Sequence, residues 1–116
     1  MLLIGSVSVS AYSNDASYNQ VHKNSLGNVL TSYTVGMHWY YDGSHVTGHD
    51  TPWYQYGGFI GWYETSHSEP VYTASDSSYY QIDGHAHYCF FYCVFQDNIY
   101  LTIWTYSNGL STYQAT

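Results

Sequence analysis

The chain has 116 residues, which suits a single domain, and only 8% of them are charged, against about 25% in a typical domain. Its one strong cation, Lys23, stands beside eight carboxylates, which excludes nucleic acid and anionic lipid headgroups as main binding partners. Aromatic residues make up 21% of the chain, enough to build a core and still expose rings. Because solubility must come from hydroxyl and amide side chains, we expect a secreted or cell-surface protein.

Residues 1–11 form an apolar stretch that ends in small side chains, with Val9 and Ala11 at the spacing of a signal-peptide cleavage site. A basic leading region is missing, so this segment is predicted to be the remnant of a truncated signal peptide. The alternative is a first strand, in which Val7, Val9 and Ala11 alternate with serines. No stretch of the chain reaches the ~20 apolar residues that a transmembrane span needs.

The next two segments differ in character. Residues 12–27 are polar and lack periodicity, which predicts a polar arm or loop, with a short strand at residues 18–22 as the alternative. Residues 28–41 alternate in bulk, which predicts a strand whose larger side chains face the core. These larger side chains are Val29, Thr31, Tyr33, Val35, Met37, Trp39 and Tyr41. We therefore place the globular domain at residues 28–116.

The middle of the chain is predicted to form short strands. Three glycines interrupt residues 53–64, which indicates a kinked or split strand. Residues 65–69 are predicted as a turn, and short strands are expected at residues 71–74 and 78–82. A last short strand is expected within residues 110–116, after the turn formers Ser, Asn and Gly.

The most apolar part of the sequence predicts a central hairpin. His85–Phe95 and Ile99–Tyr106 are rich in aromatic and β-branched residues, and the polar residues 96–98 separate them as a turn. Within the second arm, alternation predicts burial of Ile99, Leu101 and Ile103. No segment of the chain has a clean helical period. The fold class is therefore all-β: a single antiparallel β-sandwich, or a small barrel, of about seven or eight short strands.

A run of aromatic side chains is the main candidate for binding. It comprises Trp53, Tyr54, Tyr56, Trp62 and Tyr63. Aromatic faces stack on sugar rings, and a sheet can present several of them together, so the expected partner is a glycan or another cell-surface molecule. The alternative is that about half of these residues fill the core.

His85 and His87 are the candidate metal ligands. On a strand both point to one face, roughly 6.6 Å apart, and Cys89 extends the same face. One divalent ion fits that spacing, although zinc wants three or four ligands. The remaining ligands would have to come from His38, His45 or His49. The alternative is a pair of histidines on a solvated sheet face, and no other cofactor is predicted.

Cys89 and Cys93 are the only cysteines. In a straight strand their Cα atoms would lie roughly 13 Å apart, whereas a disulfide needs roughly 4.4–6.8 Å. A bridge therefore requires a turn or a bulge at residues 90–92, which are poor turn formers. An oxidising compartment favours the bridge, and the alternative is two small apolar side chains in the core. The sequence leaves both states open.

The sequence contains no Gly-x-Ser-x-Gly elbow and no phosphate-binding glycine loop, so we expect no catalysis. The segment Ala11-Tyr12-Ser13-Asn14, with the following His22 and Lys23, resembles the start of lactococcin 972-type bacteriocins. Those are small secreted β-sandwiches rich in Tyr, Trp, His and Gly. The resemblance covers a handful of residues, and this chain is longer and is acidic where those peptides are basic.

These observations predict a small non-catalytic protein that acts by surface contact, as an aromatic-rich binding or adhesion module. Two alternatives remain open. One is a secreted effector of the bacteriocin type that the resemblance implies. The other is a structural subunit that self-associates through exposed strand edges, because few charged side chains guard those edges.

Overall fold

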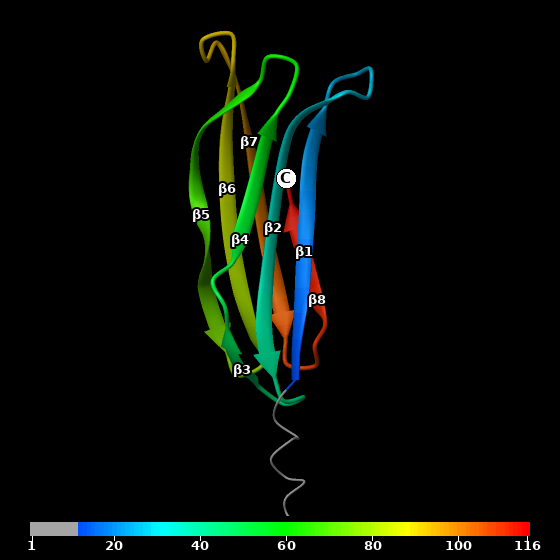
Figure 1. The fold of residues 1–116 in the computed structure, drawn as a ribbon, viewed down its shortest axis with the longest axis vertical. Coiled ribbons are helices and arrows are strands. Elements are labelled where there is room, and N and C mark those ends of the chain that lie inside the picture. The colour runs from blue at the N-terminus through cyan, green and yellow to red at the C-terminus, as the bar shows by residue number, and fades with distance from the viewer. Residues whose placement is uncertain (1–11) are drawn as a thin grey trace, which may run out of the picture.

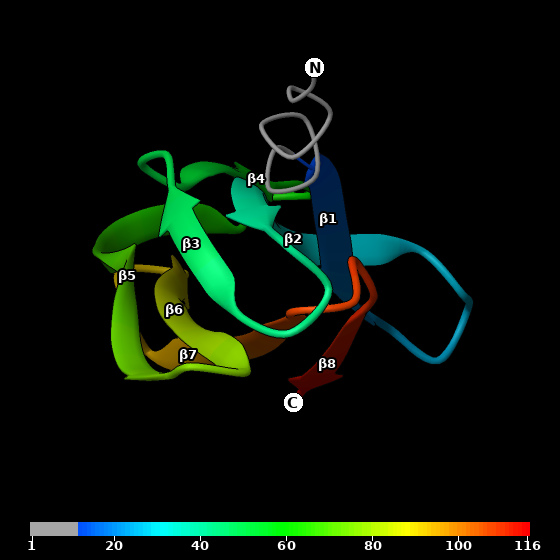
Figure 2. The same ribbon diagram turned by 90° about the horizontal axis from the view of Figure 1, so that it is seen from below.

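The computed structural model describes residues 12–116, which form two four-stranded antiparallel sheets packed face to face (Figures 1 and 2). The first sheet contains β1 (Tyr12–Lys23), β2 (Val29–Tyr41), β3 (Val46–His49) and β4 (Trp53–Gly58). The second contains β5 (Tyr63–Asp76), β6 (Tyr79–Phe90), β7 (Phe95–Tyr106) and β8 (Ser111–Ala115). The predicted all-β sandwich is therefore confirmed. No helix that could cross a bilayer occurs between residues 12 and 116.

The long strand β2 organises the first sheet. Its whole length pairs with β1 on one flank, and two shorter strands share its other flank. Residues 31–36 pair with β4, and residues 39–41 pair with β3. The chain then crosses to the second sheet, where β5 to β8 pair in sequence order. The predicted split of residues 53–64 is confirmed, because β4 and β5 lie in different sheets on either side of a turn.

The core lies between the two sheets and is built by alternation along β2, β6 and β7. Its buried members are Tyr33, Val35, Met37, Trp39, Ile82, Ala86, Tyr88, Ile99, Leu101 and Ile103. The predicted inward face of β2 is confirmed by its central residues, and so is the burial of Ile99, Leu101 and Ile103. Complete burial of an apolar side chain of this size contributes roughly 1.5–3 kcal/mol, so this strip accounts for much of the stability.

The prediction of a polar arm at residues 12–27 is wrong. Tyr12–Lys23 forms β1, which pairs with β2 along its full length, so the sandwich begins at Tyr12 instead of residue 28. The strand escaped detection because most of its side chains are polar and exposed, and only a few, including Ala16 and Tyr18, pack against the core. Residues 1–11, with the predicted signal-peptide remnant, lie outside the described residues.

Two predicted turns are also misplaced. Residues 65–69 belong to β5, where register shifts accommodate Pro70 in a strand that pairs on one side only. The central hairpin turns at residues 91–94, whereas residues 96–98 pair within β7. Polar residues at 96–98 resemble a turn in sequence, yet they lie in a regular strand, where Gln96 and Asn98 face outward and Asp97 faces the first sheet.

Side chains close one flank of the sandwich, where β1 faces β7 and β8. The Asn14 amide donates to the Gly109 carbonyl at 2.9 Å, and Tyr18 stacks on Tyr113 with ring centroids 4.2 Å apart. Farther along, Asp97 of β7 accepts from the Thr31 hydroxyl at 2.6 Å and lies 2.7 Å from Nδ1 of His22. These side-chain contacts hold the two sheets together along this flank.

The turns at one end of the sandwich, the lower end in Figure 1, bond to one another through their backbones. The Gly43 amide donates to the Ser107 carbonyl at 3.0 Å, and the Ser107 amide donates to Ser78 at 2.9 Å. The Val46 amide donates to Ser77 at 2.8 Å. We call residues 42–45, 77–78 and 107–110 the polar end.

Candidate binding face on the second sheet

The outer face of the second sheet combines aromatic rings with amide, hydroxyl and imidazole groups. Alternation along β6 and β7 turns apolar side chains inward and leaves these groups outside. From β6 they are Gln81, Asp83, His85 and His87, and from β7 they are Gln96, Asn98, Tyr100, Thr102 and Trp104. The two rows lie in register, so each β6 side chain has a β7 neighbour directly across from it.

A stacked pair of rings marks the middle of this face. His85 and Tyr100 are cross-strand partners, with ring centroids 4.4 Å apart and planes only 7° from parallel. The His85 Nε2–H donates to the Asn98 side-chain oxygen at 2.8 Å, which fixes the ring's orientation. Tyr100 remains 53% exposed, so its outer surface is open to a ligand.

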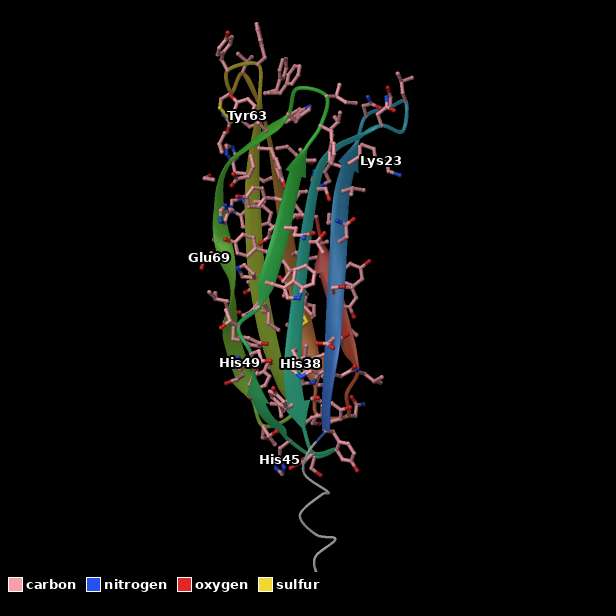
Figure 3. The ribbon with its side chains drawn as sticks, viewed as in Figure 1. Lys23, His38, His45, His49, Tyr63 and Glu69 are labelled. Atoms are coloured by element: carbon pink, nitrogen blue, oxygen red, sulfur yellow. A yellow bond between two sulfur atoms is a disulfide. The ribbon has the colours of Figure 1, made fainter. Side chains whose placement is uncertain are left out.

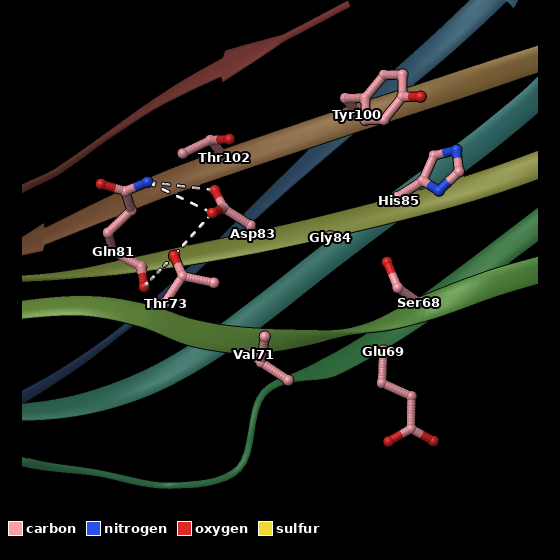
Figure 4. A pocket seen from close by; sticks show the side chains of 10 residues that line it. All are labelled: Ser68, Glu69, Val71, Thr73, Gln81, Asp83, Gly84, His85, Tyr100 and Thr102. Carbon is pink, nitrogen blue, oxygen red and sulfur yellow. Dashed lines mark hydrogen bonds between the residues drawn. The ribbon is translucent and has the colours of Figure 1, made fainter.

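A hollow of about 540 Å³ lies beside this stacked pair (Figure 4). Its wall includes Asp83 and Thr102, and Ser68 and Val71 border it on the side of β5. The register of β5 shifts between Ser68 and Val71, so the strand departs from regular pairing with β6 at the hollow. The hollow is therefore a consequence of the irregular strand around Pro70.

The polar groups in the hollow are fixed by bonds to one another. The Thr73 hydroxyl donates to the Asp83 carboxylate at 2.7 Å, and the Gln81 amide approaches the same carboxylate at 3.4 Å. Next along the face, Trp104 Nε1–H donates to the Gln81 side-chain oxygen at 3.2 Å. Such a network holds acceptors and donors in place before a ligand arrives, which lowers the entropic cost of binding.

The five aromatic residues that sequence analysis singled out do not form one surface. Trp53 lies over Gly36 on the first sheet, where a Cβ atom on the glycine would come within 2.1 Å of the indole ring. Tyr54 and Tyr56 lie on β4, with the His67 ring 5.0 Å from each of theirs. Of the remaining two, Trp62 lies in the β4–β5 loop and Tyr63 begins β5, at the end of the sandwich away from the polar end (Figure 3).

Around Tyr54 the contacts favour a structural cluster. His67 lies between two partners, with Nδ1 2.7 Å from a Glu64 oxygen and Nε2 3.1 Å from the Tyr54 hydroxyl. Burial, and next the neighbouring Glu69 carboxylate, raise the pKa of Tyr54. These bonds link β4 to β5 and so close the second flank of the sandwich.

The two candidate metal ligands bond to side chains of the same face. His87 Nε2–H donates to the Gln96 oxygen at 2.9 Å, and its Nδ1 accepts from the Thr65 hydroxyl at 2.7 Å. In residues 12–116 no group of three or more His, Cys, Asp or Glu side chains is arranged to hold a metal ion. His38, His45 and His49 belong to the first sheet and its turn (Figure 3).

Cys89 and Cys93 form a disulfide in the structure, with their Cα atoms 4.5 Å apart. The bridge spans the β6–β7 turn, where Phe91, Tyr92 and Cys93 all have positive φ, between 54° and 64°. Left-handed backbone at three successive residues shortens the distance that a straight strand would impose. The sequence could not show this, because none of the three residues favours such a conformation.

Sequence reasoning missed Tyr100, Asp83 and Trp104 as members of a binding face. The alternation of the strand did indicate this. If Ile99, Leu101 and Ile103 face the core, the residues between them, such as Tyr100, must face outward. Searches against protein families, curated proteins and solved structures each returned no match. The class that the fold and this face define is a small antiparallel β-sandwich with a polar, aromatic sheet face.

Proposed function

We propose that the protein is a secreted or cell-surface binding module without catalysis, which holds a neutral oligosaccharide on the outer face of its second sheet. The observation that carries this proposal is the exposed His85–Tyr100 stack beside the hollow at Asp83. A pyranose ring offers an apolar face and a rim of hydroxyls. It therefore needs an aromatic surface next to fixed hydrogen-bonding groups, which is the combination found here.

Charge supports a neutral ligand. Asp83 and Glu69 both border the hollow, and the one strong cation of the chain, Lys23, lies at the end of β1 in the other sheet. An acidic sugar would meet carboxylates without a compensating cation. Hydroxyl groups of a neutral sugar, in contrast, can donate to the Asp83 carboxylate, which has acceptor sites beyond the one that Thr73 uses.

A glycan array followed by titration calorimetry tests the proposal. We expect binding to neutral glycans, with Tyr100→Ala lowering the affinity at least about tenfold, because a stacked anchor contributes 1.4 kcal/mol or more. Tyr113→Ala is the matched control, since Tyr113 is 50% exposed on the same sheet but stacks on Tyr18 at the flank. Equal losses in both variants, or binding to acidic glycans alone, would contradict the proposal.

A further inference from the structure

The end of the sandwich opposite the polar end carries three connections, which are the polar β1–β2 turn at residues 24–28 and two loops rich in apolar side chains. The two apolar loops, residues 59–63 and 90–95, contain no charged residue, and we call these two loops the apolar end. Tyr92 is 90% exposed, Val94 67% and Ile60 62%, and Phe59, Phe91 and Phe95 are about half exposed. Exposed apolar patches of this kind on a small soluble protein indicate a contact surface.

The two loops form one surface. Trp62 from the β4–β5 loop stacks on Phe90 at the end of β6, with ring centroids 5.4 Å apart. The Tyr63 hydroxyl lies 3.8 Å from the Cys93 sulfur, and Tyr63 pairs with Cys89 across the sheet. In Figure 1 both loops project at the top of the molecule, and Figure 3 labels Tyr63 at this end.

The backbone of the β4–β5 loop is unfavourable for the residue that it carries. Ile60 and Gly61 both have positive φ, 55° and 87°, and the Trp62 amide donates to the Phe59 carbonyl at 3.1 Å. Hairpin turns with two positive φ values normally carry Asn, Asp or Gly. A β-branched residue in the left-handed region is strained. The large exposed side chain of Ile60 therefore destabilises the turn that carries it.

The β6–β7 loop shows the same conflict over three residues. Phe91, Tyr92 and Cys93 all occupy the left-handed region, where bulky residues are uncommon. The disulfide between Cys89 and Cys93 spans the turn and holds this conformation. Both loops therefore place bulky apolar side chains where folding alone would place small polar ones.

We propose that the apolar end docks on the interface of a bilayer of zwitterionic phospholipid, with the strands standing away from the membrane. Trp and Tyr are the side chains that prefer the headgroup level, and the aliphatic and Phe side chains reach below it. A fluid bilayer accepts separate projecting side chains, whereas a stable protein partner needs a complementary surface of roughly 800 Å². The net charge of −7 and the single Lys disfavour anionic lipid.

Vesicle flotation tests this proposal with phosphatidylcholine alone and with phosphatidylcholine mixed with phosphatidylserine. We expect the full chain to float with the pure phosphatidylcholine vesicles, without weakening at high salt. Ile60→Asn and Tyr92→Asn should each lower the partition coefficient about tenfold, since each removes one apolar side chain that the bilayer would bury. Because Asn tolerates the left-handed region, both variants should keep the fold.

Leu110→Asn is the control, because Leu110 is 65% exposed at the polar end and should not reach the bilayer. Absence of flotation with phosphatidylcholine, a requirement for phosphatidylserine, or equal loss in the Leu110→Asn variant would overturn the proposal. So would a dimer in vesicle-free solution that Ile60→Asn dissociates, because the apolar end would then bind a second copy. The vesicles carry no glycan, so this test is independent of the proposed oligosaccharide site.

Discussion

The turns of the polar end and the two loops of the apolar end are built from opposite kinds of residue. At the polar end, the Asp42 carboxylate accepts from the backbone amides of Ser44 and His45 at 2.8 and 2.7 Å, which lowers its pKa. Asp76 accepts from the Ser78 amide at 3.1 Å in the same way. In the two loops of the apolar end, Gly61 shares the left-handed backbone with the bulkier residues Ile60, Phe91, Tyr92 and Cys93.

This difference distinguishes turn residues that folding explains from turn residues that contact with another molecule would explain. The turns at the polar end satisfy their backbone groups with side chains that suit a turn, so their composition is explained by folding alone. In the two loops of the apolar end, the one comparable contact comes from Gln96 just outside the turn, whose amide donates to the Cys93 carbonyl at 3.4 Å. The composition of these two loops supports the docking role proposed above, and in the β6–β7 loop one disulfide spans the left-handed residues.

The largest expected effect is alkaline unfolding, which tests the core that joins the two ends. Burial raises the pKa of Tyr33 to about 12, and it raises the pKa of Tyr72 and Tyr88 as well. An unfolded tyrosine loses its proton near pH 10, so above that pH the unfolded state binds fewer protons and stability falls. We expect cooperative unfolding between about pH 10 and 12, followed by phenolate absorbance and circular dichroism.

The variant Tyr33→Phe sharpens this test. It removes one of the groups that the unfolded state ionises, so the alkaline midpoint should move to higher pH. Complete tyrosine titration near pH 10 with an unchanged dichroism spectrum would contradict the prediction, because the phenols would then ionise in the folded state.

A pair of tryptophan variants compares the core next to the polar end with the apolar end. Trp39 is fully buried and its Nε1–H donates to the Tyr106 carbonyl at 3.0 Å, just before the β7–β8 turn. Trp39→Ala should lower the free energy of unfolding by about 3–5 kcal/mol. Trp62→Ala at the apolar end should cost only about 1–2 kcal/mol, because that ring is half-buried. Urea denaturation measures both, and similar losses would mean that the two ends contribute equally to stability.

Removing the disulfide should have an intermediate effect, confined to the apolar end. The double variant Cys89→Ser, Cys93→Ser opens a short loop, so we expect about 2 kcal/mol less stability. Hydrogen exchange should accelerate at Val94, whose amide donates to the Phe91 carbonyl, and stay unchanged at Gly43. Faster exchange at both ends would show that the bridge supports the whole sandwich.

The smallest expected effect is a gain in stability. Ile60→Asn should raise the free energy of unfolding by about 1 kcal/mol, because Asn tolerates the left-handed region better than a β-branched residue. Leu110→Asn, at an equally exposed site of the polar end, should change it by less than about 0.5 kcal/mol. Thermal unfolding compares the two, and a loss of stability for Ile60→Asn would refute the claim of strain.

Sequence reasoning succeeded where side chains alternate about a buried stripe, as in β2 and in the Ile99–Ile103 run of β7. It failed at β1, because a strand with mostly exposed polar residues lacks that stripe and is held by pairing with β2. It also misplaced the central turn, because polar residues 96–98 look like a turn while a disulfide bends the apolar residues before them. The hollow at Asp83 depends on the register shifts in β5, and Pro70 indicates an irregular strand there without specifying the shape of the hollow.

The full-length pairing of β1 with β2 also has a mechanical consequence. Tyr12 lies at the polar end of the sandwich, and β1 runs from there toward the other end (Figure 1). A pull on Tyr12 against an anchored apolar end would act along the strands, whereas the hydrogen bonds between antiparallel strands lie across them. Such a load is shared by all the bonds of the β1–β2 ladder at once, so this strand would resist tension in shear instead of peeling off one bond at a time.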